Sequence, residues 1–279
     1  MREIESSIII ATVRRLCIEA NCLLPEDLKN RMKELYDLES WPGARSVLEQ
    51  IMENEAIARN GFVPICQDTG MACVFLKIGQ DVHISGNLND AVHEGVRQGY
   101  REGYLRKSVV GDPIRRVNTG DNTPAVIYME LVPGDQIEIT VAPKGFGSEN
   151  MSQIKMLRPS DGLEGVKEFI LQVVEDAGPN PCPPIVVGVG IGGTFEKAAY
   201  ISKKALLRPV DQPNSDPFYA ELEKEMLERI NSLGIGPQGF GGRTTALAVN
   251  IETFPTHIAG LPVSVNIGCH VTRHATEVI

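Results

Sequence analysis

Three cysteines lie in tight loops rich in glycine or proline, at Cys66, Cys182 and Cys269, where the sequence reads ICQDTG, NPCPP and NIGCH. A buried structural cysteine behaves as a small hydrophobe and usually lies on the apolar face of a helix or strand. A thiol in a turn lies where the chain reverses and backbone N–H groups are not used by regular structure. Three such thiols, far apart in sequence, are able to converge on one metal centre.

The spacing of these thiols excludes the compact metal motifs. No C-x-x-C pair occurs, so zinc-ribbon and ferredoxin arrangements are absent. Three ligands without a fourth would leave one metal position open. In an iron–sulfur cluster that open iron acts as a Lewis acid, which is able to bind a substrate hydroxyl and carboxylate. A zinc-stabilised structural subunit and a non-enzymatic iron or redox sensor remain alternatives at this point.

Of the other three cysteines, we expect Cys17 and Cys73 to be packing residues. Cys17 lies on the apolar face of a predicted helix, Cys22 belongs to the same helical region, and Cys73 is a packing residue of a predicted strand.

A glycine-rich segment, Gly188 to Gly193, matches G-x-G-x-x-G between a strand and a helix. The helix is followed by the loop 208–217, and we find no next strand to complete the βαβ unit of a dinucleotide site. We therefore expect no nicotinamide or flavin. The N–H groups near Thr194 suit a carboxylate or help to position a neighbouring loop instead.

Further polar loops indicate a shared site. They lie at Val117–Pro124, Lys144–Asn150 and Gln238–Thr245, beside predicted strands, and two of them carry a cation. Each alone is explained as a turn. Several in one chain favour a common polar site, because functional residues gather on loops held by a rigid scaffold.

Composition limits the functional class. The 279 residues are 42% hydrophobic and 23% charged, with a net charge of −9, which argues against a nucleic-acid surface. The first fifteen residues resemble neither a signal peptide nor a membrane span. We expect a cytoplasmic protein without membrane contact, whose six cysteines are reduced.

The elements that must position these loops form an α+β or mixed α/β fold. We predict a helical segment over 4–60, followed by mixed sheets with flanking helices. All of it belongs to a single domain, 1–279, with 1–60 as a helical part of that domain. Apolar periodicity predicts helices at 89–104, 162–177, 194–207 and 217–233, and strands at 71–78, 124–132, 136–142, 184–190 and 245–253, with a hairpin at Pro133–Asp135.

Taken together, the motifs resemble those of the class I, iron–sulfur fumarate hydratases. The chain is similar to the α subunit of the two-component form, and close to L-tartrate dehydratase α subunits. The resemblance extends over nearly the whole chain. The matching motifs, in order, are Cys66–Gly70, Leu105-Arg106, Val117–Gly120, Lys144-Gly145-x-Gly147-Ser148-x-Asn150, Cys182–Pro184, Gly239–Gly242, and His257 before Cys269.

The resemblance implies a [4Fe–4S] cluster held by Cys66, Cys182 and Cys269, with the fourth iron left for substrate. It implies a hydro-lyase that reversibly hydrates fumarate to L-malate in the tricarboxylic acid cycle, with L-tartrate dehydration as the alternative. It further implies a small dicarboxylate substrate surrounded by Gln67, Asp68, Arg106, Gly147 and His257.

Three departures from the family pattern accompany this resemblance. Phe146 stands where longer members have glycine, and Arg243 stands where lysine is common. The chain ends ten residues after Cys269, without the carboxy-terminal domain of single-chain members. The resemblance therefore implies a separate β subunit, in a hetero-oligomer with dimerisation.

Each residue has a chemical role and an alternative. Asp68 suits proton transfer, or caps its own turn. Arg106 is able to bind a carboxylate through two parallel hydrogen bonds, or is solvated at a helix end. His257 donates to substrate or shuttles a proton, or is a core histidine. His270 and His274 support the site or lie at a subunit interface.

Overall fold

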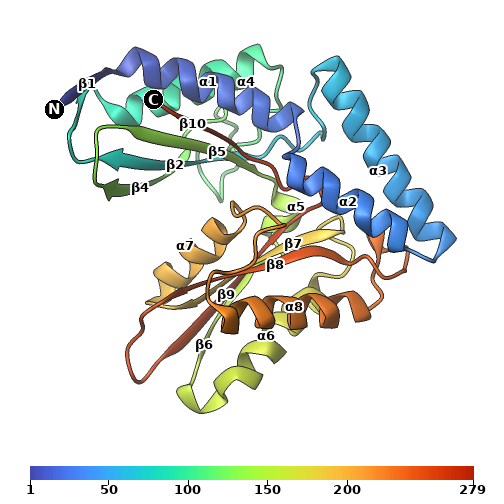
Figure 1. Ribbon diagram of the computed structural model, residues 1–279. Helices are drawn as coiled ribbons and strands as arrows, with labels where there is room; N and C mark the ends of the chain where they lie inside the picture. Colours follow the sequence, from blue (N-terminus) through green and yellow to red (C-terminus); the bar gives the residue numbers. More distant parts are fainter. The chain divides into compact units, whose positions relative to one another are not determined.

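The computed structural model describes residues 1–279 and confirms the mixed α/β fold, with a helical N-terminal segment followed by mixed sheets (Figure 1). The chain divides into two compact units. Unit 1 comprises 1–25, 54–146 and 273–279, and unit 2 comprises 26–53 and 147–272. No helix is both long enough and apolar enough to cross a membrane. The single domain over 1–279 stays a prediction.

The N-terminal segment is helical as expected, in three helices. They are α1 (Ser6–Cys22), α2 (Glu26–Leu38) and α3 (Pro42–Gly61), and α3 contributes residues to both units. The sequence did not predict the short strand β1 (Arg2–Glu5), which pairs in parallel with β3 (Val82–Ser85).

Unit 1 is built on a four-stranded sheet with the order β10-β5-β2-β4. Its strands are β2 (Met71–Gly79), β4 (Val126–Val132), β5 (Ile137–Lys144) and β10 (Ala275–Val278). Helices α1 and α4 (Leu88–Glu102) cover one face of this sheet (Figure 1). Gly95 and Gly99 let the two helices approach closely, because a Cβ on either would lie within 3 Å of α1 atoms.

The hairpin predicted at Pro133–Asp135 is wrong. β4 and β5 do not pair with each other, since β2 lies between them, parallel to β4 and antiparallel to β5. The turn does reverse the chain, but it passes over the end of β2. Gly79 and Asp81 donate to Gln136 and Gly134 there, each at 2.9 Å. Six of the nine residues of β2 are buried, which agrees with its inner position in the sheet.

Unit 2 is built on a second four-stranded sheet with the order β6-β9-β7-β8. The chain enters it through the short helix α5 (Phe146–Glu149). The strands are β6 (Gln153–Leu157), β7 (Ile185–Gly192), β8 (Ala246–Phe254) and β9 (Leu261–Gly268), and the remaining helices are α6 (Gly162–Ala177), α7 (Phe195–Ala205) and α8 (Pro217–Ser232), with 3₁₀ turns at Pro159–Asp161 and Pro237–Gly239.

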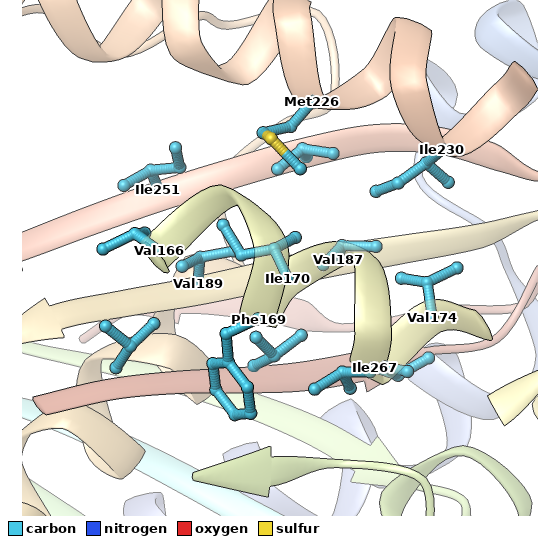
Figure 2. Packing of buried hydrophobic residues seen from close by; sticks show 14 of the residues in the cluster. Val166, Phe169, Ile170, Val174, Val187, Val189, Met226, Ile230, Ile251 and Ile267 are labelled. Carbon is cyan, nitrogen blue, oxygen red and sulfur yellow. The ribbon is translucent and has the colours of Figure 1, made fainter. Parts of the chain in front are cut away.

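The main core of unit 2 lies between this sheet and the helices α6 and α8. Figure 2 shows Ile170 and Val174 of α6 and Met226 of α8 packed against Val187 and Ile267 of the central strands. The apolar positions of α6 and α8 recur every three to four residues, so each helix buries one stripe against the strands. These strands end at the loops that carry the predicted site residues.

The glycines that resembled a dinucleotide fingerprint have a packing role. Gly188 and Gly190 lie inside β7 and face α7, where an added Cβ would be 2.2 Å from the carbonyls of Ser202 and Ala198. Our reason for rejecting the motif was wrong, because β8 does follow and pairs in parallel with β7. The close approach of helix and strand explains these two glycines without a ligand.

Candidate functional site

The six cysteines fall into two groups by exposure. None is in a disulfide, and the three predicted ligands, Cys66, Cys182 and Cys269, are exposed or half-buried, whereas Cys17, Cys22 and Cys73 are buried. Burial raises the pKa of the Cys17 thiol to about 12, so it stays protonated in the core. The packing roles predicted for Cys17 and Cys73 agree with this burial.

In unit 1, Cys66 begins a loop that is stabilised by hydrogen bonds between its own residues. The N–H of Asp68 points to Cys66 Sγ at 3.4 Å. The Asp68 carboxylate accepts the N–H of Gly70 at 3.0 Å and the N–H of Phe146 at 2.9 Å. Asp68 therefore has the turn-capping role that we gave as its alternative, and its carboxylate is fixed in place. Gln67, the residue between them, is exposed.

Buried side chains support this loop from below. The Tyr100 hydroxyl donates to the carbonyls of Thr69 and Gly70 at 2.6 and 3.0 Å. Asn122 Nδ2 also donates to Gly70 O, at 3.1 Å. The buried Arg273 guanidinium donates to the Asp68 carbonyl at 2.6 Å. The backbone of the loop is thus held by a phenol, an amide and a cation.

Arg106 is tied to the same loop through its backbone. Thr69 Oγ1 donates to the Arg106 carbonyl at 2.9 Å, while the Arg106 side chain is exposed. The Cys66–Gly70 loop and the Arg106 backbone are therefore neighbours within unit 1. An arginine whose backbone is fixed and whose guanidinium is exposed suits recognition of a carboxylate.

In unit 2, the Cys182 loop is bonded to the chain around Cys269. The Cys182 carbonyl accepts the backbone N–H of His270 at 3.3 Å and lies 2.9 Å from His270 Nδ1. Gln238 donates to the Pro183 carbonyl from both its backbone N–H and its side-chain amide, each at 2.8 Å. Two of the three predicted ligand loops are therefore joined within this unit.

Cys269 follows the last residue of β9, a buried central strand that the sequence analysis missed. Thr272 closes the turn after it, donating to the Cys269 carbonyl from its N–H and its hydroxyl at 2.9 and 2.7 Å. The start of β9 at Leu261-Pro262 hid the strand, since proline inside an apolar run argues against a central strand. The thiol at its end is consequently carried by a rigid element.

Gly147 lies on α5, which is anchored by an ionic network. Glu149 of this helix pairs with Lys203 and accepts the Asn266 amide at 2.9 Å. Asn266 belongs to β9, so α5 is fixed to the strand that leads to Cys269. Gly147 itself is exposed.

His257 is exposed in the turn between β8 and β9, which excludes our alternative of a core histidine. Its Nδ1 accepts the N–H of Ala259 at 3.2 Å, so the neutral ring carries its proton on Nε2. In this tautomer, the Nε2–H group is able to donate a hydrogen bond to a ligand.

The predicted residues therefore form two sets, one on each unit. Neither unit by itself brings three cysteine, histidine or acidic side chains close enough to hold a metal ion. The meeting of all three thiols at one centre stays a prediction.

Four supporting residues were not predicted from the sequence as parts of the site: Tyr100, Asn122, Gln238 and Arg273. His270 was expected to support the site or to lie at a subunit interface, and the structure gives it a supporting contact. Asn122 and Gln238 could have been predicted from the sequence, because they lie in the polar loops Val117–Pro124 and Gln238–Thr245. Both residues have positive φ, 63° and 52°. Tyr100 and Arg273 could not, since their partners are backbone carbonyls distant in sequence.

The chemistry of the donor set fits an iron–sulfur cluster. Three accessible thiols stand at loop positions, while the remaining cysteines are withdrawn into cores. A backbone N–H directed at Cys66 Sγ matches the hydrogen bonds that stabilise cluster thiolates.

Several known proteins are similar to this chain. The family model described as Fumarate hydratase (Fumerase) matches residues 10–278, which include both units. A putative L(+)-tartrate dehydratase subunit alpha of Methanocaldococcus jannaschii is 47% identical over 265 residues, 93% of each chain. The L(+)-tartrate dehydratase subunit alpha of Escherichia coli O157:H7 is 35% identical over 260 residues, 92% of this chain and 86% of the relative. The chain therefore belongs to the class I fumarate hydratase family and is a hydro-lyase.

Proposed function

We propose that this chain is the α subunit of a two-component hydro-lyase that adds water to, or removes it from, a small dicarboxylate. The observation that carries the proposal is the division of the cysteines: the three in family motifs are accessible and the other three are buried. The resident group would be a [4Fe–4S] cluster held by Cys66, Cys182 and Cys269. When bound, it would supply Lewis acidity toward a substrate hydroxyl and carboxylate.

Two reactions are candidates for this site. The family model is described for fumarate hydratase, which favours hydration of fumarate to L-malate. The relatives from M. jannaschii and E. coli are described as tartrate dehydratase subunits, which favours dehydration of L-tartrate. The two substrates differ by one hydroxyl, so the same carboxylate-binding groups serve either.

The chain's own residues would bind and orient the substrate. Arg106 would hold one carboxylate through two parallel hydrogen bonds, and the Gln67 amide and the Gly147 backbone would contribute further polar contacts. Asp68 would transfer the proton of the carbon adjacent to the hydroxyl-bearing carbon, using oxygen lone pairs that Gly70 and Phe146 do not engage. His257 would donate from Nε2 to substrate or carry a proton away.

A β subunit would complete the enzyme. The matched relatives from M. jannaschii and E. coli are described as alpha subunits, which supports a partner of a different sequence. The absence of disulfides suits a reducing compartment such as the cytoplasm.

The test is anaerobic purification of the chain with and without its β partner, followed by iron and sulfide assays. Turnover of fumarate, L-malate and L-tartrate is then compared. We expect a cluster on the chain, activity only in the pair, and loss of activity in air with recovery on adding iron and reductant. A cluster without hydro-lyase activity in the pair would support the sensor, and one zinc without sulfide would support the structural subunit.

A further inference from the structure

The carbonyl of Cys182 is bonded twice by one residue. It accepts the backbone N–H of His270 at 3.3 Å and lies 2.9 Å from the ring atom Nδ1 of the same residue. His270 directly follows Cys269, so this pair of contacts joins the two cysteine loops of unit 2. The contact spans 88 residues of sequence.

The direction of the side-chain bond follows from the partners of the ring. The Gln238 amide nitrogen lies 3.3 Å from Nδ1, but it donates to the Pro183 carbonyl over the shorter distance of 2.8 Å. A carbonyl oxygen only accepts, so Nδ1 must carry the proton to bond Cys182 at 2.9 Å. His270 is therefore a donor through Nδ1.

The segment that receives this bond needs external support. Cys182 has φ of 56°, in the left-handed region, and its side chain is exposed. This conformation is unfavourable for a residue with a Cβ and persists only where the surroundings fix it. Inside its own loop, the backbone contact is the N–H of Cys182 donating to Pro179 O at 3.1 Å. From outside the loop, His270 bonds the Cys182 carbonyl itself, and Gln238 bonds the carbonyl of the neighbouring Pro183.

We propose that His270 is a positioning residue, which holds the Cys182 loop against the end of β9 so that Cys182 and Cys269 are arranged before the cluster binds. This inference rests on the proposed function, because it assigns both thiols to the cluster. A preformed pair of ligands lowers the ordering cost of binding and slows release of the bound group.

Three substitutions separate the hydrogen bond from the bulk of the ring. His270→Ala removes the donor. His270→Asn keeps an amide nitrogen on Cγ, close to the place of Nδ1, whereas His270→Gln moves its nitrogen one bond further out. Asn and Gln are both neutral amides, so they form a matched pair even if the alanine variant folds poorly.

Two measurements distinguish positioning from general stability. The first is amide hydrogen exchange of peptides containing 180–184 and 268–272 in the cluster-free chain. The second is the rate at which a chelator removes iron from the reconstituted chain. We expect exchange and iron loss to rise about tenfold in the Ala and Gln variants, and to stay near wild type in the Asn variant, with little change in melting temperature.

Equal exchange and equal iron loss in the Asn and Gln variants would overturn the inference. So would an alanine variant that matches wild type in both measurements. If the wild-type chain itself assembles no cluster, the proposed function fails instead, and hydrogen exchange in the cluster-free variants still decides the role of His270.

Discussion

The two sets of proposed cluster ligands are held in different ways. In unit 1, the Cys66 loop rests on buried side chains, with Tyr100 and Asn122 fully withdrawn from solvent. In unit 2, Cys182 is exposed on a strained loop that is held by His270 and Gln238 at its surface. The first loop is part of a folded core, and the second is supported from one side.

This difference separates folding from ligand placement. Loss of a buried group beneath Cys66 leaves carbonyl or N–H groups unsatisfied, which lowers the stability of the whole unit. Loss of a contact at Cys182 releases a loop and leaves the core intact. Substitutions beneath the Cys66 loop should therefore lower the free energy of unfolding. Substitutions at either the Cys66 loop or the Cys182 loop should impair cluster assembly.

The largest effect is expected on removing a proposed ligand. Cys182→Ser should reduce iron and sulfide in the reconstituted chain to background, because serine cannot replace a thiolate in a three-cysteine site. Cys66→Ser should do the same from the other unit. Cys73→Ala, which changes a buried cysteine, should retain the cluster. Iron content near wild type in Cys182→Ser would contradict the ligand assignment.

The next largest effect is expected beneath the Cys66 loop. Asn122 is 0% exposed and accepts the N–H groups of Ser108 and Val109 while donating to Gly70. Asn122→Ala should cost about 3 kcal/mol in urea unfolding, since two backbone N–H groups lose their acceptor and Gly70 O loses one of its two donors. The exposed Asn118, in the same polar loop, is the control, and Asn118→Ala should cost less than about 1 kcal/mol. An equal loss of unfolding free energy in the two variants would contradict the idea that buried side chains beneath the Cys66 loop stabilise unit 1.

Arg106 tests whether the unit 1 surface binds substrate. Arg106→Ala should lower kcat/KM by about 10- to 100-fold, through a higher KM and a lower kcat, with iron content unchanged. Arg115 is an exposed arginine of the same segment that pairs with Asp112, and Arg115→Ala should leave kinetics unchanged. Similar losses in both variants would indicate a general charge effect instead of carboxylate binding.

The smallest effect is a pH dependence within unit 1. Burial alone would raise the pKa of Asp121, but hydrogen bonds from Thr123 and Arg97 outweigh it and lower the pKa from 3.8 to about 2. Because the folded pKa lies below the unfolded one, the stabilisation is complete above about pH 4 and disappears as the pH falls through about 2.

Asp121→Asn should therefore cost about 1 kcal/mol at pH 5, allowing for solvent screening, and progressively less toward pH 2. Urea unfolding of both proteins at several pH values measures the difference. A cost that does not depend on pH would assign the effect to the lost hydrogen-bond geometry.

Local patterns predicted the long helices and the buried strands of the fold. The periodicity of Gly162–Ala177 and Pro217–Leu233 located α6 and α8 within a residue, because each buries one apolar stripe. The turn at Pro133–Asp135 was also recognised, but not the insertion of β2 between β4 and β5. Strand pairing is a non-local property, so turn residues that reverse the chain do not specify which strand lies next to which.

The sequence predicted those site residues whose chemical type and turn-forming neighbours occur together in one loop. Cys66, Asp68 and Cys182 stand among turn residues, and the structure places each in a loop. The roles of Tyr100 and Arg273 were not predictable, since a hydrogen bond to a carbonyl some 30 or 200 residues away leaves no mark on spacing.

The sequence by itself determined the identity of the thiols, the polar loops around them and the amphipathic helices, since these depend on residue type and near neighbours. Only the tertiary structure decided which carbonyl His270 contacts and how closely α7 packs against Gly188 of β7. Burial and hydrogen-bond partners are set by chain segments that meet after folding, and local composition does not encode those meetings.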